Sequence, residues 1–178
     1  MLKKATSTTI VIWKSHHQEA LNELVSTITS PPLLCYPDFY QPFILNVDAS
    51  SKGLGCSLYQ KIEGNLKILG FGSRSLSKAE TRYHSSKLEF LALKWAVCNK
   101  FRNYLLYAPK IDVYTDNNPL LYVLSSAKLN ATSQRWVNEL ADFHLHLHYK
   151  PGAKNQDADA LSRFPDNISQ YSIETDQS

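Results

Sequence analysis

The sequence predicts an α/β fold in which a five-stranded mixed sheet is flanked by helices. Three strand-like segments joined by short turns lie between residues 43 and 73, and such turns join antiparallel strands. Two later strand-like segments, 111–115 and 143–149, each follow a helix-like segment. A strand that is reached through a helical crossover lies parallel to its neighbour. We therefore expect the first, fourth and fifth strands to be parallel neighbours.

The 178 residues are enough for one domain and an appendage. Residues 1–40 are expected to be a partly helical lead-in, with a helix over 15–28 that ends before Pro31, because proline cannot continue a helix. The domain itself is expected to span residues 41–165. The polar segment 166–178 is expected to be a disordered tail.

The strands of the antiparallel part are predicted from alternation and turn residues. In the first strand, 43–48, Phe43, Leu45 and Val47 alternate with the other side chains. Turns at 50–53 and 63–65 separate it from strands at 54–60 and 66–73. Because successive side chains of a strand point to opposite faces, this alternation places the apolar side chains on one face of the sheet.

The long helix is predicted over residues 85–102, and it is apolar nearly all round, which indicates burial against the sheet. Trp136, Leu140 and Phe143 have helical spacing, and we expect them in the core. The remaining predicted elements are a strand at 111–115, helices at 119–124 and 133–142, a strand at 143–149 and a last short helix at 157–163.

Composition limits the functional classes only loosely. A net charge of +3 without a long Lys/Arg run permits contact with nucleic acid but does not demonstrate it. The three cysteines form no CxxC pair, which favours reduced intracellular thiols. The apolar stretches are far shorter than the roughly 20 residues of a membrane-spanning helix, and no signal peptide is visible. We expect an intracellular protein without a membrane contact.

Four carboxylates stand where the predicted fold could gather them. Asp48 and Asp116 end the first and fourth strands, where open α/β sheets place their sites. Glu89 lies within the apolar helix, and Asp159 opens the last helix. An acid at a helix N-terminus also stabilises the helix, and for Asp159 taken alone we favour that role. Because burying unpaired acids is costly, the four together predict a site neutralised by bound cations.

Oxygen ligands alone select hard cations, so Mg²⁺ or Mn²⁺ fits these residues and zinc does not. Two such ions about 3.5–4 Å apart can align an attacking water and stabilise the leaving oxygen of a phosphodiester. A second candidate lies on the fifth strand, where His144, His146 and His148 share one face at a spacing that could bind a transition metal. No acid or cysteine is evidently paired with them, so we favour a solvated or helix-covered strand face.

Five blocks carry a family resemblance, in order and with compatible gaps: 43–50 (FILNVDAS), 73–77 (SRSLS), 87–93 (KLEFLAL), 114–117 (YTDN) and 158–163 (ADALSR). They resemble the ribonuclease H domain of reverse transcriptases from gypsy-type LTR retrotransposons. The lead-in looks like the segment that joins that family's polymerase to its ribonuclease H. The resemblance covers about residues 13–165.

The resemblance implies a ribonuclease H-like fold and hydrolysis of the RNA strand of RNA–DNA hybrids with two Mg²⁺ ions, Mn²⁺ serving as a substitute. By motif position, the catalytic and metal-binding acids are Asp48, Glu89, Asp116 and Asp159. Asp157 is a near neighbour of the last acid, but the spacing to the 160–163 block favours Asp159. The expected substrate-binding residues are Ser50, Asn117 and Arg135. For Arg135, which could reach a phosphate, a solvated surface charge is an equal alternative.

Several departures from the pattern matter. The loop 151–155 has no histidine, which cellular ribonucleases H carry before the last acid, and the region 125–130 is too short for their basic handle. Grip on the hybrid is therefore expected to depend on a polymerase domain. Residues 114–117 end in Asn, so no Tyr-x-Asp-Asp polymerase motif is present.

Three alternatives stay open. The chain is expected to be an RNA–DNA hybrid endonuclease and a fragment of a larger polyprotein. The alternative is a domesticated or decayed copy that binds nucleic acid or a partner protein without cutting, which the four intact acids argue against. A weaker third reading is a nuclease of the same fold that acts on DNA. Dependence of the activity on Mg²⁺ separates an enzyme from a binding module.

Overall fold

The computed structural model describes residues 11–29, 35–123, 129–152, 155–163 and 173–175. The chain divides into two compact units, one made of Met1–Leu33 with Pro165–Ser178 and the other of Leu34–Phe164. No helix in these described ranges is long and apolar enough to cross a membrane.

The described residues of the first unit form one long helix and two short strands. Helix α1 (Ser15–Thr29) matches the helix predicted over 15–28. Strand β1 (Val11–Trp13) pairs in parallel with β7 (Ile173–Thr175), and neither strand is predicted from the sequence. The strand β7 falls in the predicted tail, whose other residues lie outside the described ranges, so a disordered tail stays a prediction.

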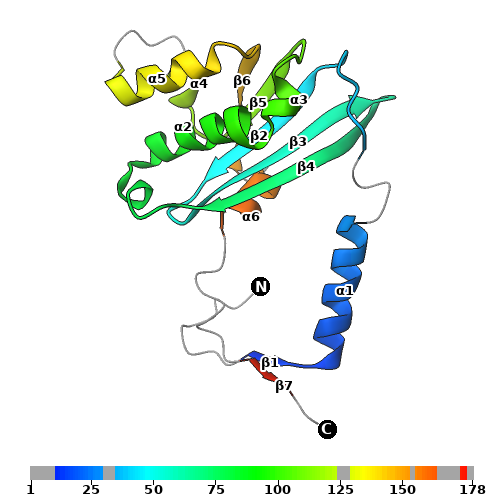
Figure 1. The fold of residues 1–178 in the computed structure, drawn as a ribbon. Helices are drawn as coiled ribbons and strands as arrows, with labels where there is room; N and C mark the ends of the chain where they lie inside the picture. Colours follow the sequence, from blue (N-terminus) through cyan, green and yellow to red (C-terminus); the bar gives the residue numbers. More distant parts are fainter. Residues whose placement is uncertain (1–10, 30–34, 124–128, 153–154, 164–172, 176–178) are drawn as a thin grey trace. The chain divides into compact units, whose positions relative to one another are not determined.

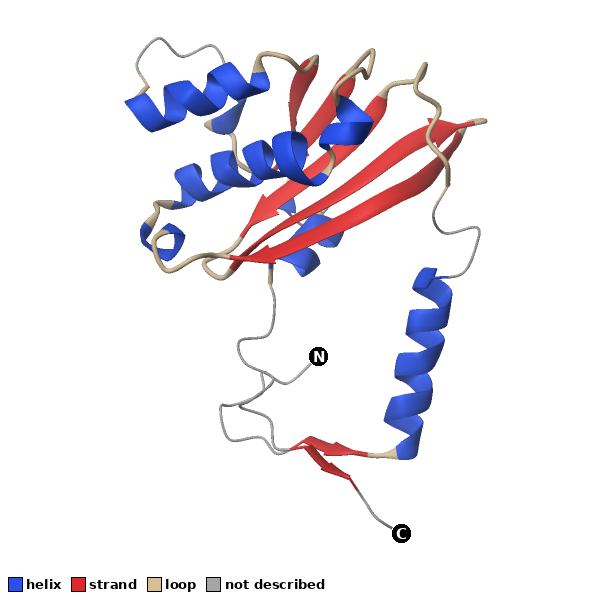
Figure 2. Ribbon diagram, in the orientation of Figure 1, coloured by secondary structure: helices blue, strands red, loops and turns tan. Residues whose placement is uncertain are grey.

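The second unit is built on the predicted five-stranded mixed sheet, in the order β4-β3-β2-β5-β6 (Figures 1 and 2). The pairs β2–β3 and β3–β4 are antiparallel, whereas β2–β5 and β5–β6 are parallel. The parallel relationship of the first, fourth and fifth strands is thus confirmed. The strands are β2 (Phe43–Ala49), β3 (Gly53–Ile62), β4 (Asn65–Ser75), β5 (Ile111–Thr115) and β6 (Leu145–Tyr149).

Helices cover both faces of this sheet. The helix α2 (Ser85–Trp95) lies along one face, and α6 (Gln156–Ser162) lies on the opposite face (Figure 1). The helix α5 (Ala131–Leu140) packs on α2, where the rings of Phe90 and Trp136 meet edge to face at 5.3 Å. The short helical segments are η1 (Glu80–Arg82), η2 (Ala96–Lys100), α3 (Arg102–Leu105) and α4 (Leu120–Val123).

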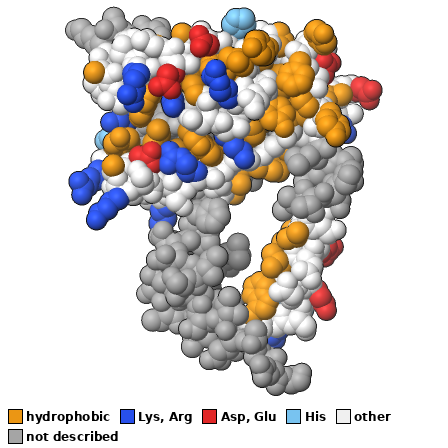
Figure 3. Space-filling view, in the orientation of Figure 1, with side chains coloured by type: hydrophobic (Ala, Val, Ile, Leu, Met, Phe, Trp, Pro, Cys, Tyr) orange, Lys and Arg blue, Asp and Glu red, His pale blue; other side chains and the backbone are white. Residues whose placement is uncertain are grey.

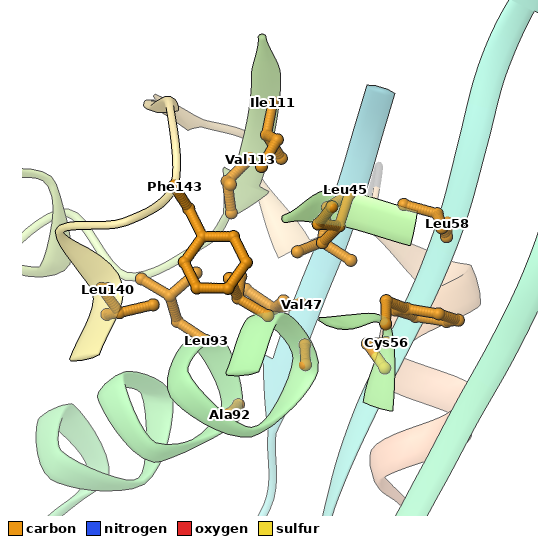
Figure 4. Close-up of a cluster of buried hydrophobic side chains, with 14 of the residues drawn as sticks. Leu45, Val47, Cys56, Leu58, Ala92, Leu93, Ile111, Val113, Leu140 and Phe143 are labelled. Carbon is orange, nitrogen blue, oxygen red and sulfur yellow. The ribbon is translucent and has the colours of Figure 1, made fainter. Parts of the chain in front are cut away.

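The hydrophobic core lies between the sheet and α2. Leu45 and Val47 of β2 point toward Leu93 of α2 and, like it, are fully buried (Figure 4). Their alternation leaves the intervening side chains of β2 on the face that α6 covers. The predicted core residues Trp136, Leu140 and Phe143 are buried, which confirms that prediction.

The long helix differs from its predicted form. It is α-helical only to Trp95 and continues as one π turn over Ala96–Lys100, in which the Phe101 N–H donates to the Ala96 carbonyl at 2.9 Å. The extra residue of a π turn changes which side chains face the core. Here the Phe101 ring lies against Gly70 of β4, where a Cβ would be 3.0 Å from the ring. The apolar pattern continues through this turn, so periodicity did not reveal it.

Candidate metal centre

Three of the four predicted acids meet at one end of the sheet. Asp48 lies near the end of β2, Asp116 directly follows β5, and Glu89 lies on α2. Each offers one carboxylate oxygen, and these three oxygens lie within 4.8 Å of one another. The parallel register of β2 and β5 pairs Asn46 with Tyr114. Two residues further along each strand, the same register brings the two aspartates together.

Glu89 reaches this end of the sheet because α2 presents small and apolar side chains to the strands. Ala92 and Leu93 are fully buried there. The Glu89 side chain is only 6% exposed, and its Oε2 has no hydrogen-bond partner within the described part of the chain. Burial, and then the charges of Asp48 and Asp116, raise the pKa of Glu89 to about 8.

Asp48 has one strong partner. The buried hydroxyl of Ser162 on α6 donates to Asp48 Oδ2 at 2.6 Å. Burial raises the pKa of Asp48 to about 6, the Ser162 hydrogen bond opposes this rise, and the charges of Asp116 and Asp159 add to it. A carboxylate in this position is costly to ionise unless a cation compensates its charge.

The donor set fits a divalent metal ion. The three carboxylates repel one another, since the charges of Asp48 and Asp116 raise the pKa of Glu89, and a bound cation would offset that repulsion. The buried Oε2 of Glu89 has no partner among the residues that the structure describes, and such an ion would supply one. Oxygen-only ligands of this kind suit Mg²⁺, Mn²⁺ or Ca²⁺. The three acids could therefore bind a metal ion.

Asp159, the fourth predicted acid, is not in this cluster. It lies in the first turn of α6, and its Oδ1 accepts a hydrogen bond from Arg163 Nε at 2.6 Å. Its charge still reaches Asp48, since it contributes to the raised pKa there. The structure therefore brings Asp159 near the centre but pairs it with Arg163.

The three predicted substrate-binding residues occupy different settings. Ser50 Oγ donates to the Ser162 carbonyl at 2.6 Å. Asn117 Oδ1 accepts from the Leu120 N–H at 3.1 Å, at the start of α4. Both side chains therefore have structural hydrogen bonds. Arg135, in contrast, has a side chain that is 74% exposed and lies 3.8 Å from Glu139 in an i,i+4 pair.

Sequence reasoning missed the role of Asp157. Its Oδ2 accepts three hydrogen bonds, from Asn46 Nδ2 at 2.8 Å, Ser57 Oγ at 2.6 Å and Tyr59 OH at 2.6 Å. Burial alone would raise the pKa of Asp157, but these hydrogen bonds outweigh it and lower the pKa. No periodic pattern marks such donors, because they come from two strands about a hundred residues away.

The histidine face of β6 has an acid partner, so the expectation that none is paired with it was wrong. His148 Nε2 lies 2.7 Å from Asp112 Oδ1, which also accepts from Lys110 Nζ at 2.9 Å. The acid lies on the neighbouring strand β5, and the pairing appears only when the register of β5 and β6 is known. Among the described residues, only Asp48, Glu89 and Asp116 form a cluster of three potential metal ligands.

The loop before α6 lies against Asp116. A Cβ at Gly152 would be 2.9 Å from Asp116 Oδ2, so this loop approaches the carboxylate with no side chain between. Residues 153–154 of the loop and residues 124–128 of the region compared with the basic handle lie outside the described ranges.

The strand order, the helices on both faces and the acids at the ends of the two central parallel strands define a ribonuclease H-like fold. Two solved structures show the same fold. A foamy viral protease–reverse transcriptase in complex with an RNA/DNA hybrid has a TM-score of 0.58 at 19% identity, over 92% of this chain and 22% of that chain. An N-terminal ribonuclease H domain from Mycobacterium tuberculosis has a TM-score of 0.51 at 14% identity, over 68% of this chain and 90% of that one.

Residues 38–143 match the family described as the RNase H-like domain found in reverse transcriptase, and the chain belongs to this family. It is 39% identical over 158 residues to the Pol polyprotein from transposon opus of Drosophila melanogaster, covering 89% of this chain and 16% of the relative. It is 38% identical over 131 residues to that from transposon gypsy of the same organism, covering 74% of this chain and 12% of the relative. The chain thus spans a small part of these polyproteins. The resemblance to gypsy-type elements is confirmed.

Proposed function

We propose that this chain is a metal-dependent endonuclease that hydrolyses the RNA strand of RNA–DNA hybrids, as a part of a retrotransposon reverse transcriptase polyprotein. The observation that supports this most is the cluster of Asp48, Glu89 and Asp116 in a member of this family. The hybrid bound to the foamy viral relative supports the choice of substrate.

Asp48, Glu89, Asp116 and Asp159 are the proposed catalytic and metal-binding residues, and Mg²⁺ is the proposed cofactor, with Mn²⁺ as a substitute. Two bound cations would supply water activation and stabilisation of the leaving oxygen of the phosphodiester. Glu89 offers its unpartnered Oε2, and Ser162 orients the Asp48 carboxylate. Asp159 completes the set once its carboxylate leaves Arg163.

Contacts with the hybrid are proposed to read backbone shape and 2′-hydroxyls rather than base sequence. Arg135 is suited to phosphate, because its guanidinium is exposed and weakly paired. Ser50 and Asn117 remain proposed contacts through the loops that follow β2 and β5. Lys and Arg side chains are scattered over the face that carries α2 and α5 (Figure 3). This dispersed charge fits the proposal that a polymerase domain contributes to the grip on the hybrid.

The remaining assignments are also proposals. Residues 1–40 would be the connecting segment from the polymerase side, residues 41–165 the nuclease domain and residues 166–178 a tail. The protein would act inside the cell, in the cytoplasm or within a retroelement particle.

The test is cleavage of a labelled RNA–DNA hybrid in Mg²⁺ and in Mn²⁺, with double-stranded RNA as the second substrate and Asp48→Asn as the control protein. The proposal expects hybrid-specific cutting that needs the metal and that Asp48→Asn abolishes. No cutting by the folded protein in either metal would reject a self-sufficient nuclease.

The ion pair between Asp159 and Arg163 favours the second candidate, a module that binds nucleic acid or a partner protein without cutting, because it leaves three acids gathered instead of four. Binding of a hybrid that persists in EDTA, without cleavage in Mg²⁺, would support this candidate.

A further inference from the structure

We infer that Asp157 is a positioning residue that fixes α6 on the sheet and thereby places Ser162 against Asp48 and holds Asp159 near the metal centre. Asp157 is not one of the proposed metal ligands. The consequence for catalysis rests on the proposed function, whereas the consequences for α6 and for cation binding can be measured without it.

The helix α6 depends on its contacts with the sheet. It has only seven residues, and its N-cap residue Asn155 makes no capping hydrogen bond with its side chain. Helices this short are unstable in isolation. The Asn155 amide instead donates to the Val47 carbonyl of β2 at 3.0 Å. The position of α6 is therefore set by its contacts with the strands.

Two glycines let the backbone of α6 lie directly on β3. A Cβ at Gly55 would be 2.3 Å from the Ala158 carbonyl oxygen and 2.5 Å from the Ser162 nitrogen. A Cβ at Gly53 would be 2.9 Å from the Ser162 carbonyl oxygen. This close approach sets the distance between helix and strand. It does not by itself set the rotation of the helix about its axis, because flat contact with glycine offers no interlocking side chain.

The rotation is set by Asp157. Its Oδ2 binds Asn46 of β2 and both Ser57 and Tyr59 of β3, so a single carboxylate joins the helix to two strands. Asn46 is 5% exposed and Ser57 fully buried. Removal of Asp157 would leave these buried donors without their acceptor. Because an unsatisfied buried donor costs free energy, the hydrogen bonds favour the native position of α6.

The opposite end of α6 has its own anchors. The hydroxyls of Ser50 and Ser73 donate to the carbonyls of Ser162 and Leu161, each at 2.6 Å. These bonds satisfy carbonyls at the helix C-terminus. Together with Asp157 and with the bond from Asn155 to Val47, they hold both ends of the helix.

Helical geometry explains why Asp157, which binds the sheet, and Asp159, the proposed metal ligand, have different roles. Side chains two positions apart on a helix point to nearly opposite sides. When Asp157 faces the sheet, Asp159 faces away from it, toward Arg163. On the same helix, Ser162 then reaches Asp48. A rotation of α6 would disturb both groups at once.

The test compares Asp157→Ala with Asp112→Ala. Asp112 also accepts two side-chain hydrogen bonds, from Lys110 and His148, but these join β5 to β6, and neither partner belongs to α6. Three quantities are measured for each protein: amide hydrogen exchange of residues 155–163, the affinity for Mg²⁺ and Ca²⁺ by calorimetry, and hybrid cleavage resolved into kcat and KM.

For Asp157→Ala we expect faster exchange in α6 but not in α2, cation affinity reduced about tenfold, and a lower kcat with little change in KM. Asp157→Asn, which keeps an acceptor oxygen, should restore part of the cation affinity. Asp112→Ala should leave all three quantities at their wild-type values. Wild-type exchange and cation affinity in Asp157→Ala would overturn the inference, as would an equal loss in Asp112→Ala.

Two further results must be distinguished: a variant that does not fold and a wild type that does not cut. If Asp157→Ala does not fold, Tyr59→Phe removes one of the three donors and should shift exchange and cation affinity in the same direction by a smaller amount; unchanged values there would also overturn the inference. If the wild type does not cut hybrids, the proposed function fails, yet exchange and cation affinity still decide the role of Asp157.

Discussion

Ser162 donates a hydrogen bond to Asp48 at 2.6 Å, although the two residues are 114 positions apart in the chain. This bond links the last helix of the domain to the end of its central strand. It opposes the effect of burial on the pKa of Asp48, and it holds one oxygen of the proposed metal site in place. The site is thus assembled from both faces of the sheet, by α2 from one side and α6 from the other.

The substitution Ser162→Ala should weaken divalent-cation binding about tenfold, because groups that orient a metal ligand typically contribute this much or more. Calorimetric titration with Mg²⁺ at pH 7 measures the effect. Ser26→Ala, at an exposed serine of α1, serves as the control and should bind as the wild type does. Equal affinities in Ser162→Ala and the wild type would mean that this hydrogen bond does not tune the site.

The stability of the metal-free protein should fall as the pH rises from about 4 to 8. Folding raises the pKa of Asp48 from 3.8 to about 6 and that of Glu89 from 4.5 to about 8. The folded state therefore binds more protons than the unfolded state in this window, and the stabilisation is lost as the pH passes the folded pKa values. Denaturant unfolding at pH 5 and pH 8 in EDTA should differ by roughly 4–5 kcal/mol.

Glu89→Gln provides the control for this pH dependence. A neutral amide removes the carboxyl with the larger shift, so the pH slope of the free energy of unfolding should become shallower. The addition of Mg²⁺ should stabilise the wild type most at pH 8, where the acids are ionised. A pH slope that is the same in Glu89→Gln and the wild type would assign it to other groups.

Gly55→Ala should destabilise the docking of α6. The new methyl group would meet backbone atoms of Ala158 and Ser162, which do not move aside as a flexible side chain does. We expect a loss of about 1–3 kcal/mol in the free energy of unfolding, measured by urea titration. Gly70→Ala is the matched comparison, since its methyl group would meet only the edge of the Phe101 ring at 3.0 Å. A greater loss at Gly70 than at Gly55 would contradict this account of the helix–strand contact.

Arg135→Ala should raise the KM for the hybrid about two- to fivefold and leave kcat unchanged, because the loss of one exposed phosphate contact weakens binding without altering the acids. The effect should shrink as the salt concentration increases. Stability should not change, since an exposed i,i+4 pair contributes little. A reduced kcat with an unchanged KM would place Arg135 in a different role.

The sheet order was predictable because short turns and helical crossovers leave few ways to pair five strands. The same rules placed Asp48 beside Asp116, and the apolar face of α2 placed Glu89 near both. These three residues meet as the sequence pattern predicts.

What the sequence did not reveal depends on side chains that meet across distant elements. The three donors to Asp157 and the Asp112 partner of His148 follow no period along the chain. The π turn after Trp95 also leaves the apolar pattern intact. The ion pair between Asp159 and Arg163 is local, at i,i+4. Motif spacing indicated Asp159 as a site residue but did not indicate that Arg163 pairs with it.

In the proposed function, the acid cluster binds the cations that drive cleavage of the hybrid. The most direct measurement is the rate of Mg²⁺-dependent cleavage of an end-labelled RNA–DNA hybrid by the wild type and by Glu89→Gln, which has nearly the same shape, beside the Mg²⁺ affinity of each. We expect the wild type to cut only with the metal, and Glu89→Gln to bind Mg²⁺ more weakly and to cut at least about a hundredfold more slowly. Equal cleavage by the two proteins, or cleavage by the wild type in EDTA, would contradict the proposed function.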